Sequence, residues 1–322
     1  MDAINHSVQD RFMIVAIGIT NSYPTGADML LRHIRYFLAV AEHRNFTRAA
    51  EALHVSQPTL SQQIRQLEDT LRTQLLDRSG RTVQLTDAGV AWMRYAKLAL
   101  QDLDAGVRAI HDVGELSRGN LRLAVTPTFT AYLVGPVIDR FYASHPGIAI
   151  EIQEMTQDQI EAQLADDKLD AGIAFEPVYA AEIESQPLFQ ETLSLVVGGG
   201  GRARASRRKP LSAQDFAKEP LVLLNKAFAT RRYIDEYCVR HRVRPQVAIE
   251  VNSISAIVEI VRHGQLATVL PDGIAREHAE LRPVPLDPPL PARTAALLQR
   301  KDAYRTAASK AFVQVLMESL KR

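Results

Sequence analysis

The sequence has little cysteine and no long apolar run, and both absences narrow the classes of protein that it can encode. Cys238 is the only cysteine, which excludes an internal disulfide. No segment approaches the roughly 20 consecutive apolar residues that a membrane-spanning helix needs. The apolar stretch at residues 12–19 lacks a basic leader and a cleavage site of small residues, so we do not interpret it as a signal peptide. We therefore expect a cytoplasmic protein without a membrane partner.

The signatures of common enzyme classes are also missing. The sequence has no GxSxG, HExxH or CxxC motif, and "VVGGGGRARASRR" at 196–208 lacks the GK[ST] ending of a phosphate-binding loop. The nine histidines show no metal-ligand spacing. We expect a protein that is not an enzyme and has no catalytic residue, cofactor or metal. Residues 196–208 are interpreted as a surface loop.

What the sequence does contain is enough apolar material for ordinary cores. With 322 residues and 46% apolar content, it can fill about two domains. The formal net charge of +1 identifies no class of partner. Regular helical spacing begins at Met29, so residues 1–28 are predicted to be an extension outside the fold.

The stretch "FTRAAEALHVSQPTLSQQIRQLE" at 46–68 predicts two helices that meet at a Ser-Gln-Pro corner. Ser56 is a good N-cap, and Pro58 in the first turn removes an N–H that would have no intrahelical partner. Buried positions at Leu60, Ile64 and Leu67 leave amides, hydroxyls and a guanidinium toward solvent. Such groups can read base edges in a major groove. The outward residues are Gln57, Thr59, Ser61, Gln62, Arg65 and Gln66.

A helical pair with a polar face also fits a plain solvated surface, so the neighbouring segment matters. Residues 75–86, "LLDRSGRTVQLT", predict two short strands around a Ser79-Gly80 turn, flanked by Arg78 and Arg81. Arginines on such a wing can hold phosphates or enter a minor groove. The wing makes a DNA-binding domain at 29–86 the better interpretation.

Residues 87–117 predict one long helix that needs a partner. Its apolar residues recur at alternating spacings of three and four, which is a heptad pattern. A helix of about 30 residues is roughly 45 Å long and too long for a small domain to cover. We expect a second subunit to cover it, although an intramolecular core helix is the alternative. The heptad residues are Met93, Ala96, Leu100, Leu103, Val107 and Ile110.

The remainder, 118–322, alternates strands with helices and predicts two α/β lobes, one formed by 118–191 plus 293–322 and the other by 192–292. Such lobes form a cleft in which a small ligand binds. The expected strands are 121–126, 149–154, 169–175, 193–198, 220–225, 246–251, 266–271 and 294–300, and the expected helices are 131–144, 157–167, 231–242, 253–263 and 303–320.

Hydroxyl and amide side chains gather where these strands end and helices begin. Helix N-termini attract anions, so a site for a small anion is predicted there. Each hydroxyl can instead simply cap its own helix, and only their convergence favours a site. These residues are Thr126, Thr128, Thr130, Thr156, Gln157, Thr230, Asn252 and Ser253.

Taken together, "FLAVAEHRNFTRAAEALHVSQPTLSQQIRQLE", "LLDRSGRTVQLTDAG" and the long helix resemble the LysR-type transcriptional regulators over residues 29–320. The resemblance implies an α+β fold with a winged helix-turn-helix, a linker helix and an effector domain of periplasmic-binding-protein type. The sequence departs from the common family pattern at two positions. Relatives often have arginine where Gln62 stands and phenylalanine where Leu76 stands. By this resemblance the DNA-binding residues are Gln57, Pro58, Thr59, Ser61, Gln62, Arg65, Arg78 and Arg81.

The resemblance further implies how such a protein works. Its partners would be double-stranded promoter DNA, RNA polymerase and other copies of the chain in a homotetramer built as a dimer of dimers. An effector would change DNA bending and let the protein act as an activator. The effector residues implied are Thr126, Thr128, Gln157, Lys226, Phe228, Thr230 and Ser253.

Segments such as "AVTPTFTAYLVGP" and "EVNSISAIVEIVR" are similar to those of cyanate-responsive regulators. The effector is therefore expected to be a small anion, cyanate, and the target an operon for cyanate degradation. A regulator of another operon with a different small organic acid is the alternative. An exported solute-binding protein would share the cleft but lack the DNA-binding residues at 29–117.

Overall fold

The computed structural model describes residues 31–112, 119–198 and 210–321. The predicted extension at 1–28 and most of the predicted loop at 196–208 lie outside these ranges. The chain divides into two compact units, Met1–Leu100 and Gln101–Arg322, which are described separately. Within the described residues, no helix is long and apolar enough to cross a membrane.

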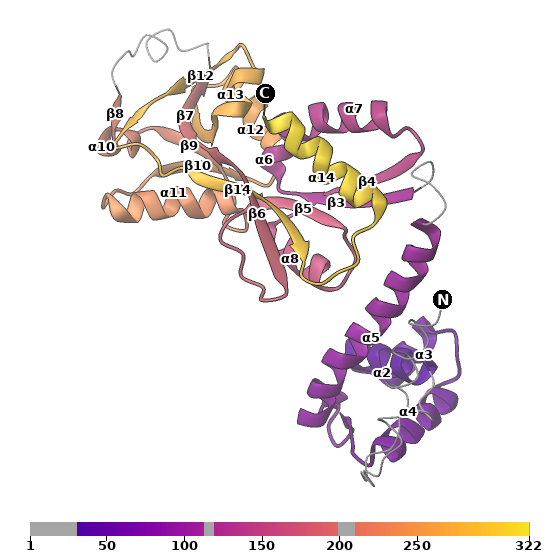
Figure 1. Cartoon of the computed structure of the whole chain (residues 1–322). Coiled ribbons are helices and arrows are strands. Elements are labelled where there is room, and N and C mark those ends of the chain that lie inside the picture. Colours follow the sequence, from indigo (N-terminus) through magenta and orange to yellow (C-terminus); the bar gives the residue numbers. More distant parts are fainter. Residues whose placement is uncertain (1–30, 113–118, 199–209, 322) are drawn as a thin grey trace. The chain divides into compact units, whose positions relative to one another are not determined.

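The first unit is a winged helix-turn-helix (Figure 1). It contains α2 (Leu31–His43), α3 (Phe46–Ala52) and α4 (Gln57–Leu71), followed by the antiparallel strands β1 (Leu76–Asp77) and β2 (Gln84–Leu85). The helices form because apolar residues recur on one face of each and meet in a single core. That core is Phe37, Val40, Ala49, Ala50, Leu60, Ile64, Leu67, Leu75 and Leu76.

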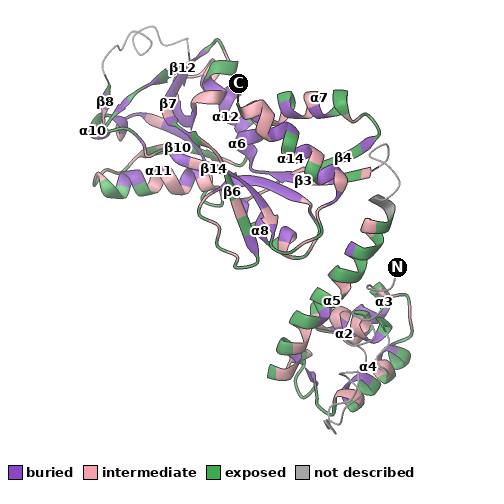
Figure 2. Cartoon of the chain, viewed as in Figure 1, coloured by how far each residue is buried: buried purple, intermediate pink, exposed green. Residues whose placement is uncertain are grey.

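Helix α5 (Asp87–Asp112) leaves the winged domain as the predicted long helix. Of its predicted heptad residues, Met93 packs against the winged-domain core and Ala96 is buried. Farther along, the exposed fraction is 52% for Leu103, 54% for Val107 and 73% for Ile110. Figure 2 shows exposed residues along much of this helix. The later part of its apolar stripe, from Leu103 to Ile110, is thus uncovered in the single chain.

The first lobe of the second unit is a five-stranded sheet in the order β4-β3-β5-β14-β6. Strand β3 (Gly119–Val125) runs parallel to β4 (Ile148–Glu154) and β5 (Ala171–Phe175), and β14 (Arg293–Arg300) runs antiparallel to β5 and to β6 (Ile183–Glu191). The helical elements of this lobe are α6 (Pro127–Phe129), η3 (Thr130–Val134), α7 (Gly135–Ser144), α8 (Gln157–Ala165) and α14 (Ala307–Leu320).

The second lobe has a sheet in the order β10-β9-β11-β7-β12. Apolar cores lie on both faces of it. The strands are β7 (Leu193–Gly198), β9 (Pro220–Leu224), β10 (Gln246–Val251), β11 (Ala267–Pro271) and β12 (Leu281–Val284), with a separate pair β8 (Leu211–Ser212) and β13 (Leu286–Asp287). The helices are α10 (Ala213–Phe216), α11 (Ala229–Arg240), α12 (Ile254–His263) and α13 (Asp272–Glu277).

The chain passes between the lobes twice. It crosses at Thr192, between β6 and β7, and returns between β13 and β14. Where these crossings meet the first lobe, Glu191 of β6 and Arg293 of β14 are directly opposite each other in the strand register. Both crossings therefore bring a charged residue to the junction of the lobes.

The predicted winged helix-turn-helix and two-lobed α/β domain are present, and α5 covers residues 87–112 of the long helix predicted at 87–117, whose residues 113–117 lie outside the described ranges. Two strands of the five-stranded sheets, β6 and β12, were absent from the expected set, and each contains a proline, Pro187 and Pro283. Proline lacks an N–H for the ladder and weakens a strand prediction. The last helix begins at Ala307 rather than 303, because Thr306 caps it by accepting from the Ser309 N–H.

Candidate DNA-binding and effector-binding sites

The amino end of α4 is built as the sequence predicts. Ser56 is the N-cap and its hydroxyl accepts from the Thr59 N–H at 3.3 Å. Because Leu60, Ile64 and Leu67 turn into the core, the polar residues of α4 are left on the outer side. Gln57, Pro58, Thr59, Gln62 and Arg65 are exposed and Ser61 is half-buried.

The wing is held by a buried carboxylate that the sequence analysis did not identify. Glu68 Oε1 accepts from the N–H groups of Leu75 at 3.0 Å and Leu76 at 3.1 Å. Its Oε2 accepts from Arg78 Nη2 at 2.6 Å, and the Arg78 guanidinium lies 5.2 Å from the centre of the Phe46 ring. Arg78 therefore has a structural partner, whereas Arg81 is exposed. Leu76, the departure from the family pattern, is 2% exposed and packs in the core.

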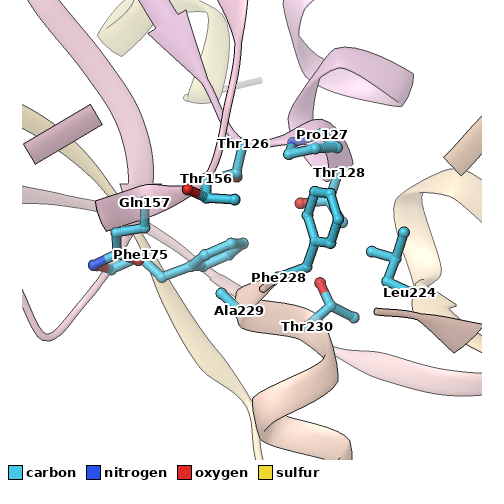
Figure 3. Close-up of a pocket in the computed structure, with 10 residues that line it drawn as sticks. All are labelled: Thr126, Pro127, Thr128, Thr156, Gln157, Phe175, Leu224, Phe228, Ala229 and Thr230. Atoms are coloured by element: carbon cyan, nitrogen blue, oxygen red, sulfur yellow. The ribbon is translucent and has the colours of Figure 1, made fainter. Parts of the chain in front are cut away.

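A pocket lies between the two lobes of the second unit, with an empty volume of about 240 Å³ that includes its open mouth. It lies where α6 and α8 begin in the first lobe and where α11 begins in the second. First-turn N–H groups of a helix have no intrahelical acceptor, so they can serve a ligand. Figure 3 shows the ring of Phe228 reaching across toward Thr128. The lining residues are Thr126, Pro127, Thr128, Thr156, Gln157, Phe175, Leu224, Phe228, Ala229 and Thr230.

Two of the lining hydroxyls are buried and have no hydrogen-bond partner among the described residues. Thr126 is 4% exposed and Thr128 is 2% exposed, and neither Oγ1 atom is paired. Thr126 is the N-cap of α6 but makes no capping hydrogen bond with its side chain. Buried polar groups usually have a hydrogen-bond partner, so two unpaired hydroxyls in one pocket point to a ligand. The capping interpretation therefore fails for Thr126.

The hydroxyl of Thr230 is bonded from behind by a buried arginine. Arg293 Nη1 donates to Thr230 Oγ1 at 3.0 Å, and Arg293 Nε donates to Glu191 Oε2 at 2.5 Å. The Arg293 guanidinium lies 3.8 Å from the centre of the Phe175 ring. Glu191 Oε1 also accepts from the Tyr132 hydroxyl at 2.5 Å. One connected network thus supports two pocket-lining residues, Phe175 and Thr230.

Burial sets the proton states of this network. It raises the pKa of Tyr132 well above its usual range, and the adjacent Glu191 carboxylate adds to the rise. Tyr132 thus keeps its proton and donates. Burial lowers the pKa of Arg293, and the Glu191 charge opposes that change. An arginine with a carboxylate partner stays charged at neutral pH.

The structure brings most of the predicted effector residues together, but not all. Thr126, Thr128, Gln157, Phe228 and Thr230 line the pocket. Gln157 points its amide nitrogen elsewhere, donating to the carbonyls of Phe175 at 2.9 Å and Pro177 at 3.0 Å. Two further predicted residues, Lys226 and Ser253, are not among the lining residues.

Lys226 and Ser253 have other surroundings. Lys226 is exposed, in the turn before α11. Ser253 is the N-cap of α12 and accepts from the Ala256 N–H at 3.4 Å, which is the plain capping role weighed from the sequence.

The residues behind the pocket were not predicted from the sequence. Arg293, Glu191 and Tyr132 are separated from the lining threonines by up to about half the chain. A charged residue at the start of the apolar strand "RTAALLQR" was the only sequence signal for Arg293. That signal does not reveal a partner, because the pairing with Glu191 depends on the sheet register.

The chain thus consists of a winged helix-turn-helix, a long helix and a two-lobed domain with a pocket between its lobes. These parts define a DNA-binding protein with a ligand-binding domain. Comparison with known proteins specifies the family. Residues 31–90 match the bacterial regulatory helix-turn-helix protein, lysR family, and residues 114–321 match the LysR substrate binding domain. The chain belongs to the LysR family of DNA-binding transcriptional regulators.

Named relatives support this assignment. The chain is 31% identical over 275 residues to a hydrogen peroxide-inducible genes activator of Pectobacterium carotovorum subsp. carotovorum, covering 84% of this chain and 90% of the relative. It is 31% identical over 249 residues to the nitrogen assimilation regulatory protein nac of Klebsiella aerogenes, covering 77% and 80%. A solved structure of a full-length OxyR variant from Pseudomonas aeruginosa matches with TM-score 0.63 and 26% identity over 91% of this chain and 95% of that one.

These comparisons support the family and not the finer resemblance. None of the relatives named above is a cyanate-responsive regulator. The family and structural neighbours are transcriptional regulators rather than enzymes, in agreement with the missing catalytic motifs.

Proposed function

We propose that this regulator binds promoter DNA through α4 and the wing, and that a small anionic effector in the interlobe pocket controls that binding. The observation that carries the effector part is the pair of buried, unpaired hydroxyls of Thr126 and Thr128. The DNA part is supported by two exposed features: the polar face of α4, where Gln62 and Arg65 can reach base edges, and the wing, where Arg81 can reach phosphate.

Cyanate is the effector proposed, with an operon for cyanate degradation as the target. The pocket is small, and a triatomic anion offers little apolar area, so its binding must depend on hydrogen bonds and charge. Thr128 supplies one such bond in this proposal. A different small organic acid and another operon form the alternative, which the same pocket accommodates.

The name of one relative, hydrogen peroxide-inducible genes activator, raises peroxide sensing as an alternative, for which a reactive cysteine thiol would be a chemical route. Cys238 is the sole cysteine of the sequence and is 4% exposed. Burial raises the pKa of its thiol to about 11, so little reactive thiolate is present at neutral pH. A small-molecule effector is therefore preferred over redox chemistry.

The active form is proposed to be an oligomer, a dimer of dimers that recruits RNA polymerase as an activator. The apolar stripe of Leu103, Val107 and Ile110 on α5 is exposed, as expected for a helix that pairs with a second copy. Replacing all three with serine is expected to shift the sedimentation of the full chain toward monomer. Unchanged sedimentation would remove α5 from the proposed interface.

The regulator and its effector are tested by gel shift and footprinting on DNA upstream of the gene for this protein, with and without cyanate, at a stated salt concentration. A footprint that shortens or relaxes with cyanate would support both parts. Binding without a cyanate response would keep the regulator and discard cyanate. Failure to bind at any salt concentration would overturn the proposed function.

A further inference from the structure

The buried arginine behind the pocket constrains the direction of a hydrogen bond inside it. Arg293 has only N–H donors and no acceptor. Its Nη1 donates to Thr230 Oγ1 at 3.0 Å, so the Thr230 oxygen is an acceptor in that bond. The proton of the Thr230 hydroxyl is then left for another acceptor, because the described residues give this hydroxyl no hydrogen bond besides the one from Arg293.

Arg293 cannot easily turn away from Thr230. Its side chain is fully buried, Nε is bonded to Glu191, and the planar guanidinium stacks on the Phe175 ring. Glu191 is held in turn by the Tyr132 hydroxyl, and the Tyr132 ring lies against Gly273, where an added Cβ would stand 2.8 Å from the ring. The direction of the Thr230 bond is therefore built into the junction of the lobes.

The opposite wall of the pocket carries hydroxyl groups that also need a partner. Thr126 and Thr128 are buried with unpaired Oγ1 atoms, so an acceptor placed between them and Thr230 would meet donors from both lobes. The single positive charge of Arg293 is offset by Glu191, and Lys226 does not line the pocket. The pocket thus offers several hydroxyl protons and no unpaired cation among its described lining residues.

We propose that Arg293 is a positioning residue that makes Thr230 a hydrogen-bond donor, so that the pocket selects small monoanions over neutral molecules of the same shape and over dianions. This inference rests on the proposed role of the pocket and narrows the class of effector. A neutral amide has one carbonyl acceptor for these hydroxyl protons and turns N–H donors toward the rest of the site, whereas a small monoanion accepts at each of its polar atoms. No cation is among the described lining residues, so an anion is held by hydroxyl protons alone, and the cost of burying its charge is much larger for a dianion than for a monoanion.

The test is calorimetric titration of the full chain with sodium cyanate, sodium formate, formamide and sodium sulfate at constant ionic strength. Formate and formamide form a matched pair, because they share a shape and differ in charge and in one donor group. Cyanate or formate is expected to bind about tenfold or more tightly than formamide and sulfate. Formamide or sulfate binding as tightly as the monoanions would overturn the proposal, and so would binding of neither monoanion.

Variants distinguish the role of Arg293 in positioning the Thr230 hydroxyl from its role in stabilising the fold. Thr230→Val removes the donated proton and is expected to reduce monoanion affinity about tenfold, whereas Thr230→Ser keeps the hydroxyl and is expected to restore it. Arg293→Lys can pair with Glu191 but lacks the planar fork that also reaches Thr230, so the ratio of formate to formamide affinity is expected to fall. Equal monoanion binding by Thr230→Val and the parent chain would overturn the proposal even where Arg293→Lys does not fold.

A gel shift without effector distinguishes this inference from the proposed function. DNA binding by the parent chain, combined with loss of the expected anion selectivity, would overturn the inference alone. Failure of the parent chain to bind DNA would overturn the proposed function, whatever the titrations show.

Discussion

The outer face of α4 and the wall of the interlobe pocket both carry amides and hydroxyls, but these polar groups stand in opposite environments. On α4 the polar groups are exposed, and water satisfies them until DNA replaces it. In the pocket, Thr126 and Thr128 are buried and unpaired, and Thr230 is satisfied only from behind by Arg293. An exposed polar face costs the fold little, whereas a buried one needs support from elsewhere in the chain.

The largest expected effect follows from breaking that support at Glu191. In Glu191→Ala, Arg293 keeps its charge in a buried position without its carboxylate, and Tyr132 loses its acceptor. We expect the effector domain to lose about 3 to 5 kcal/mol of unfolding free energy, measured by circular dichroism in urea. The matched control is Arg232→Ala, which removes an ion pair to Asp158 at 3.7 Å whose side chains are 40% and 66% exposed. This control is expected to lose less than about 1 kcal/mol of unfolding free energy. Equal losses of unfolding free energy in the two variants would contradict the claim that the buried ion pair supports the fold more than the exposed one.

In the DNA-binding unit, the corresponding buried polar support is Glu68. Glu68→Ala leaves the N–H groups of Leu75 and Leu76 without their acceptor and frees Arg78. An unsatisfied buried donor costs about 1 to 3 kcal/mol, so the wing is expected to open more often. Hydrogen exchange at the Leu75 and Leu76 amides of the full chain measures this, with Glu51→Ala on the exposed face of α3 as control. Unchanged protection at both amides would show that Glu68 does not hold the wing.

The comparison also explains what the sequence could predict. The α4 face was predictable because a helix places residues on one side by spacing alone, and Ser56 and Pro58 mark its start. Thr126, Thr128 and Thr230 were predictable as a set, because strand ends and helix starts meet at one edge of each sheet. Sequence spacing was thus sufficient wherever a single element determines the position.

The remaining site residues depend on long-range geometry. Arg293 contacts Thr230 and Glu191 only because β14 returns to the first lobe and pairs with β6 in one particular register. Lys226 was expected near the effector from the resemblance to the family, but it lies exposed in the turn before α11 and does not line the pocket. Local patterns carry no information about either outcome.

On the exposed face, substitutions should alter DNA binding and leave the fold unchanged. Gln62→Ala is expected to reduce discrimination between operator and mismatched DNA by about 1 to 3 kcal/mol, if its amide reads a base edge. Arg81→Ala, a matched wing variant, is expected to weaken binding to all sequences similarly and to reduce the slope of affinity against salt by about one unit. Fluorescence anisotropy at several salt concentrations separates these patterns. If Gln62→Ala instead lowered the affinity for every DNA sequence equally, Gln62 would contact the DNA backbone and not a base edge.

The smallest effect should come from a buried hydroxyl with no ligand to serve. Thr268 on β11 is fully buried with an unpaired Oγ1, like Thr128, but it does not line the pocket. Replacing an unsatisfied hydroxyl with a methyl group removes a desolvated polar atom, so Thr268→Val and Thr128→Val should each change the unfolding free energy by less than about 1 kcal/mol, toward greater stability. Only Thr128→Val should weaken effector binding in titrations. The two hydroxyls are alike in burial and differ in access to the pocket, so equal loss of effector binding in both variants would show that Thr128 does not act by contacting the ligand.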